Sequence, residues 1–133
     1  MVKPEGSSKL RIAGWVLSGL IAAFLCFSAA GKFLKPLPAG TVEVIEHLGI
    51  PLEKLPTIGV MEVLCIVLFL IPRTAFVGAI LLAGYLGGAA ATHLRVGDPW
   101  IMPVVIGVVA WVGYGLRRPD VILAAFGPRP QSK

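Results

Sequence analysis

The most informative feature of this sequence is how little charge it carries. Only 14% of its 133 residues are charged, whereas 56% are hydrophobic. A soluble domain carries roughly a quarter charged residues, so the deficit argues against a soluble domain and indicates a membrane protein. The length suits a single domain over residues 1–133.

The chain also lacks the motifs of common catalytic and cofactor sites. It has neither a P-loop nor a G-x-G-x-x-G pattern. Cys26 and Cys65 do not form a C-x-x-C pair, and we expect both to pack as small hydrophobes. The two histidines lie in different segments, so we expect no metal site, and we expect His47 to be solvated. Basic residues are scattered between apolar segments instead of forming a patch, which argues against nucleic-acid binding.

Four long apolar segments predict an all-α integral membrane protein, folded as a four-helix bundle. The predicted spans are about 12–33, 57–71, 74–94 and 100–116. About 20 residues rising 1.5 Å each cross the roughly 30 Å hydrocarbon core. The second span is short and contains Glu62, and helix tilt or local bilayer thinning would absorb the mismatch. The first span is longer than the about 7–15 apolar residues of a signal peptide, so we expect it to be retained.

Two short segments are predicted to be interfacial helices at opposite membrane faces. Residues 41–48 should lie over the mouth of the bundle, and residues 120–126 should lie at the other face.

The distribution of positive charge predicts how the chain is oriented in the membrane. Eight basic residues fall on the side of the termini and four on the other. The eight are Lys3, Lys9, Arg11, Arg73, Arg117, Arg118, Arg129 and Lys133. Because cytoplasmic loops carry the excess of lysine and arginine, both termini should be cytoplasmic, in a bacterial inner membrane.

Small residues indicate where the helices should approach one another. Gly84 and Gly88 have G-x-x-x-G spacing in the third span, and we expect this ridge to pack inside the chain. In the first span the side formed by Gly14, Ser18, Ala22 and Ala29 is also expected to face inward. These ridges predict the inward faces of their helices.

Three ionisable residues, Lys32, Glu62 and His93, should lie at one depth near the outer membrane face. The predicted polar pocket comprises Lys32, Glu62, Tyr85, Thr92, His93 and Asp98. Because an unpaired carboxylate within a span is costly, Glu62 should be protonated or paired, with Lys32 as the natural partner. One interpretation is a structural ion pair between the first two spans. The other is a site that binds a quinone-like head group or relays a proton.

The sequence resembles the DoxX-like family of small four-helix membrane proteins over roughly residues 10–118. The matching motifs are Ser28-Ala29-Ala30-Gly31-Lys32-Phe33, Gly59-Val60-Met61-Glu62, the small-residue run 84–91, and His93-Leu94-Arg95-Val96-Gly97-Asp98-Pro99. The family takes its name from a subunit associated with thiosulfate:quinone oxidoreduction, and other members are implicated in membrane redox complexes or membrane-protein chaperoning. The resemblance implies the same fold.

Together these features predict a membrane subunit that is not an enzyme on its own. Its partners would be the lipid bilayer and a soluble or membrane redox protein that it supports or helps to assemble. No cofactor is expected in this interpretation. The alternative is a quinone-interacting oxidoreductase component whose outer pocket holds the head group. A small transporter is the third hypothesis, weakened by the lack of an internal repeat.

Overall fold

The computed structural model describes residues 5–127, which form helices and turns. Lys3, Arg129 and Lys133, which contribute to the predicted orientation, lie outside this range. The long helices are α1 (Glu5–Gly31), α3 (Leu55–Leu70), α4 (Ala75–Arg95) and α5 (Ile101–Arg117). The short ones are α2 (Thr41–His47), the 3-10 helix η1 (Leu52–Lys54) and α6 (Pro119–Phe126). The all-α class predicted from the apolar runs is confirmed.

Two of the long helices are both long and apolar enough to cross a bilayer. They are α1, through its segment Ser8–Gly31, and α4. With 16 and 17 residues, α3 and α5 fall short of 18, although α5 and α6 together would make a third span across their 104° bend. At 1.5 Å per residue, α3 spans about 24 Å. The predicted crossing by α3, and with it a count of four spans, stays a prediction.

The four long helices pack as a ring of neighbours. Helix α1 packs against α3 and α5, and α4 packs against the same two helices, whereas the backbones of the diagonal pairs do not come close within the described residues. Two glycines allow particularly close approach. A Cβ at Gly14 of α1 would lie 2.8 Å from the Gly113 oxygen of α5, and one at Gly78 of α4 would lie 2.2 Å from the Phe69 nitrogen of α3. These glycines therefore fix two of the four contacts in the ring.

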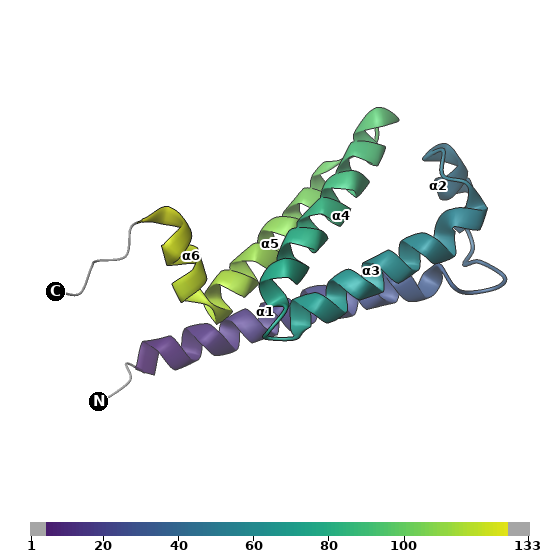
Figure 1. Ribbon diagram of the computed structural model, residues 1–133. Coiled ribbons are helices and arrows are strands. Elements are labelled where there is room, and N and C mark those ends of the chain that lie inside the picture. Colours follow the sequence, from purple (N-terminus) through teal and green to yellow (C-terminus); the bar gives the residue numbers. More distant parts are fainter. Residues whose placement is uncertain (1–4, 128–133) are drawn as a thin grey trace.

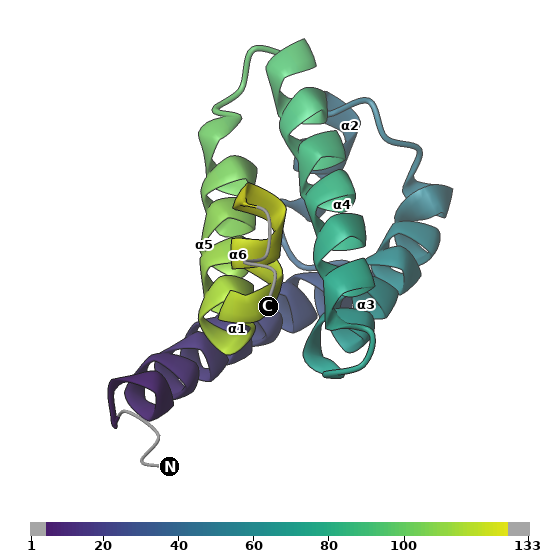
Figure 2. The same ribbon diagram turned by 60° about the vertical axis from the view of Figure 1, so that its left-hand side comes forward.

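The helix pairs α1–α3 and α4–α5 diverge from the end where these two glycines lie (Figure 1). The first half of α1 and helix α6 also lie toward that end, and Figure 2 shows the same divergence from another side. Helix α2 lies at the opposite, open end, as predicted for an element near the mouth. Its preceding Gly40 has a positive φ of 77°, and Gly49, with φ 68°, follows shortly after its end, where the left-handed backbone stops the helix.

The inward side predicted for the first span is confirmed, since Ser18, Ala22 and Ala29 are buried. The outer surface of α1 is apolar: Leu20, Phe24 and Phe27 are all more than half exposed. An exposed apolar surface on a long helix is expected of a membrane protein, in which lipid takes the place of water.

Candidate functional site

The predicted ion pair between Lys32 and Glu62 is confirmed. Lys32 directly follows α1, and its Nζ donates to the Glu62 Oε2 of α3 at 2.6 Å. The same Nζ donates to the Ser28 Oγ at 2.8 Å and to the Ser28 backbone oxygen at 3.2 Å. The Glu62 side chain is 1% exposed and that of Lys32 is 17% exposed. The ammonium group thus joins the end of α1 to α3 through Glu62, and its two other acceptors belong to Ser28 of α1 itself.

A glycine on α3 places the carboxylate opposite the lysine. A Cβ at Gly59 would lie 2.8 Å from the Phe33 ring and 3.4 Å from the Lys32 Cβ, so the glycine lets α3 approach the end of α1. Glu62 lies about one turn further along α3, on the same side. From α4, the half-buried Tyr85 approaches the Glu62 carboxylate. Three helices therefore contribute to this polar cluster.

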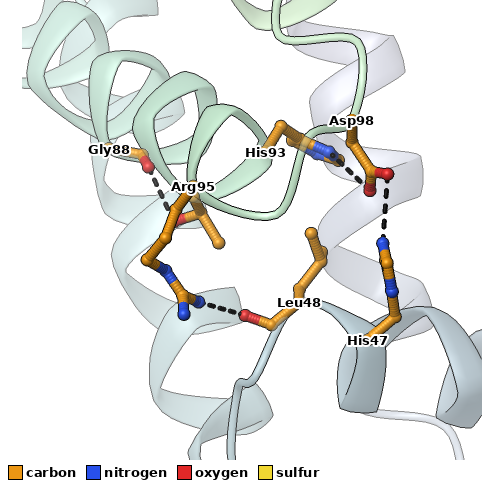
Figure 3. Close-up of polar contacts among 7 residues, drawn as sticks. His47, Leu48, Gly88, His93, Arg95 and Asp98 are labelled. Carbon is orange, nitrogen blue, oxygen red and sulfur yellow. Dashed lines mark hydrogen bonds and ion pairs between the residues drawn. The ribbon is translucent and has the colours of Figure 1, made fainter.

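The other predicted pocket residues form a second group, on the rim at the open end (Figure 3). Asp98, in the loop after α4, lies between two histidines. Its Oδ1 is 3.0 Å from the His47 Nε2 of α2, and its Oδ2 is 3.6 Å from the His93 Nδ1 of α4. His47 was expected to be solvated, and although half-exposed it is paired with Asp98. A contact across 51 residues of sequence leaves no local signal, so the sequence did not reveal it.

Helix α2 is tied to α4 by a second polar contact. The Arg95 guanidinium donates to the Leu48 backbone oxygen at the end of α2 (Figure 3). Gly49 lies directly beneath this guanidinium, where a Cβ would be 3.2 Å from the Arg95 Nη2. The Thr92 hydroxyl, also expected in the pocket, donates at 2.8 Å to the Gly88 oxygen of its own helix.

The expectation that Gly84 and Gly88 pack against another helix of this chain is wrong. Both are exposed, and a Cβ at either would meet no heavy atom within 4 Å. Helix α4 instead packs through Ala75, Gly78 and Leu82, which are buried on another side. The chain thus leaves the predicted small-residue ridge uncovered.

Arg117 is a structural residue that the sequence indicated only as a charge at a helix end. It is 5% exposed, and its Nη1 donates to the Ser18 Oγ of α1 at 3.1 Å and to the Phe69 oxygen of α3 at 3.2 Å. The guanidinium carbon lies 3.9 Å from the Trp15 ring centroid, a cation–π distance. Because Phe69 is in the last turn of α3, the positive charge also lies at the negative end of that helix dipole. Arg117 therefore joins three helices.

The described residues contain no cluster of three or more histidine, cysteine or acidic side chains placed to hold a metal ion. Cys26 and Cys65 are free thiols, the first exposed and the second buried.

The DoxX-like family model matches residues 16–113, and the chain belongs to this family. The match includes the Lys32–Glu62 pair and the His93–Asp98 contact and stops short of Arg117. Comparison with curated proteins and with solved structures gave no match.

Proposed function

We propose that this protein is a non-catalytic subunit or scaffold partner of a membrane-associated redox complex. The observation that carries the proposal is the uncovered face of α4, where Gly84 and Gly88 have no heavy atom near the position of an added Cβ. Helices in lipid associate through small residues that let backbones approach closely. Such a face within a largely apolar helix suits contact with a helix of another protein.

The buried charges also support a structural role. Lys32 and Glu62 join α1 to α3, and Arg117 joins α5 to α1 and α3. Each group is engaged with the protein's own polar atoms, as expected where burial of charge serves a specific packing arrangement. The redox character of the partner is inferred from the resemblance to the DoxX-like family.

We further propose that the chain resides in a bacterial inner membrane with four spans and cytoplasmic termini. The eight-to-four asymmetry of basic residues supports this orientation. The first half of α1 and helix α6 lie toward the same end of the molecule, which agrees with an even number of crossings (Figure 1).

The second candidate function is contact with a quinone at the Lys32–Glu62 cluster. Lys32 is 17% exposed and Tyr85 approaches the same carboxylate, so an ammonium and a phenol lie near one point, where a quinone oxygen would replace one of the acceptors of Lys32. Both groups donate hydrogen bonds of the kind that quinone oxygens accept. Bound ubiquinone that is present in the wild type and lost in Glu62→Gln would favour this function.

Affinity extraction in a mild detergent, followed by mass spectrometry, tests the principal proposal. We compare the wild type with Gly88→Leu and with the matched control Gly19→Leu, an exposed glycine of α1 that also has open space around it. A partner protein should be retained by the wild type and by Gly19→Leu and lost from Gly88→Leu. Retention of the same partner by all three proteins would exclude the α4 face as its contact.

A further inference from the structure

A groove of about 650 Å³ runs between α4 and α5 on the outside of the helix ring. Glycines and apolar side chains line it, including Gly87 and Ala83 of α4 and Gly107 and Gly115 of α5. Trp111 contributes the one polar side-chain atom of the lining, its indole nitrogen. From Pro103 to Gly115 the groove follows about 18 Å of helix axis. That length is close to the roughly 15 Å depth of hydrocarbon in one leaflet, half of the bilayer core.

Helix α6 crosses one end of this groove. It turns by 104° from α5, and its Ile122 lies over Gly115, where a Cβ would be 3.1 Å from the Ile122 Cγ1. A membrane-spanning helix seated along the groove would collide with α6 at this end. A lipid chain would not, because it stops at the headgroup level, where an interfacial helix also lies.

Two exposed arginines, Arg73 and Arg118, lie at this end of the α4–α5 pair. Arg73 precedes α4 and Arg118 follows α5, and both lie at the same end of this helix pair because the two helices are antiparallel. The Phe76 and Tyr114 rings, with centroids 6.3 Å apart, show that the first turn of α4 lies beside the end of α5.

Two further charged groups lie at this end. Asp120 accepts two hydrogen bonds from Arg118, at 3.0 and 2.8 Å, and the guanidinium lowers the pKa of this carboxyl. Arg117 points away from the groove, toward Ser18 and Phe69. Because Arg118 neutralises the charge of Asp120, the positive charge of Arg73 remains as an excess at this end of the groove.

We propose that the α4–α5 groove binds one anionic phospholipid, with an acyl chain along the glycine floor and the headgroup phosphate between Arg73 and Arg118. The apolar lining matches the chain, the length matches one leaflet, and the flanking charge matches the phosphate. Each basic residue near a membrane surface contributes enough attraction to an anionic lipid to change binding about fivefold.

Native mass spectrometry of the purified chain tests this, with equimolar phosphatidylglycerol and phosphatidylethanolamine as probes. We expect one phosphatidylglycerol to be retained in preference to phosphatidylethanolamine. Arg73→Gln and Arg118→Gln should each reduce that preference about fivefold. Lys54→Gln, at the opposite end of α3, should leave it unchanged.

A second experiment tests whether a bulky side chain in the groove prevents lipid binding. Gly87→Leu should abolish the preference for the anionic lipid, and Gly84→Leu is the control, because it lies on the same helix outside the groove. Neither position has a heavy atom within 4 Å of an added Cβ, so both variants should fold, and thermal unfolding in detergent checks this. Equal retention of the two lipids by the wild type would mean surface lipid only and would overturn the proposal. So would equal losses in Gly87→Leu and Gly84→Leu, or a second copy of the chain found in place of lipid.

Discussion

Replacing Glu62 with glutamine removes the charge from a carboxylate that is 1% exposed and 2.6 Å from the Lys32 Nζ. Breaking a buried ion pair by changing one partner typically costs about 3–5 kcal/mol, because the other charge is left without a partner. Here Lys32 keeps its hydrogen bonds to both Ser28 oxygens and is 17% exposed, which reduces the loss of stability. A hydrogen bond to a charged group contributes about 1.5–3 kcal/mol. We therefore expect Glu62→Gln to lower the free energy of unfolding by about 2–3 kcal/mol.

The pairwise part of this loss is measured by a double-mutant cycle. Lys32→Met alone should also destabilise, since it leaves the buried Glu62 carboxylate without its cation. The double variant Lys32→Met with Glu62→Gln should recover much of the loss and lie within about 1 kcal/mol of the wild type. Equilibrium unfolding in one detergent, with all four proteins in parallel, gives the coupling energy. Simple addition of the two single losses in the double variant would mean that Lys32 and Glu62 do not stabilise one another, contrary to this prediction.

Three further changes test the packing and the rim. Gly78→Ala should lower the free energy of unfolding in detergent by about 3 kcal/mol, since its Cβ would overlap the α3 backbone. Gly88→Ala should lower it by less than about 1 kcal/mol, because the surroundings of Gly88 are open. Arg117→Lys should lower the free energy of unfolding by about 2 kcal/mol in the same assay, because a lysine keeps the charge and loses the contact of the planar guanidinium with the Trp15 ring. An unchanged free energy of unfolding would contradict the role of Arg117 in joining three helices. Asp98→Asn should speed amide hydrogen exchange in α2 by weakening its contact with His47, and unchanged exchange would mean that other contacts hold α2 in place.

The helices and the Lys32–Glu62 ion pair were predictable from the sequence, because in each case the alternative arrangement has a large free-energy cost in the membrane. Long apolar runs force helices in lipid, where backbone groups must be paired within the segment. The free-energy cost of an unpaired charge within the membrane predicted that Lys32 and Glu62 form an ion pair, although 30 residues separate them.

Other features were not predictable from the sequence, because more than one arrangement fitted the pattern. Helix α4 carries small residues on two sides, and periodicity does not tell whether Gly78 or Gly88 faces a neighbour. From the sequence, Arg117 is interpreted as one of the basic residues that orient the chain in the membrane. No local pattern indicates that its guanidinium contacts Ser18, 99 residues away. The His47–Asp98 contact likewise depends on where α2 lies after folding.

Photo-crosslinking in native membranes shows whether the exposed face of α4 contacts another protein. A photoreactive amino acid is placed at position 88, with position 19 as the matched exposed position on α1. We expect a crosslinked protein adduct of defined mass from position 88 and crosslinks to lipid alone from position 19. Lipid crosslinks alone from both positions would contradict the proposed contact.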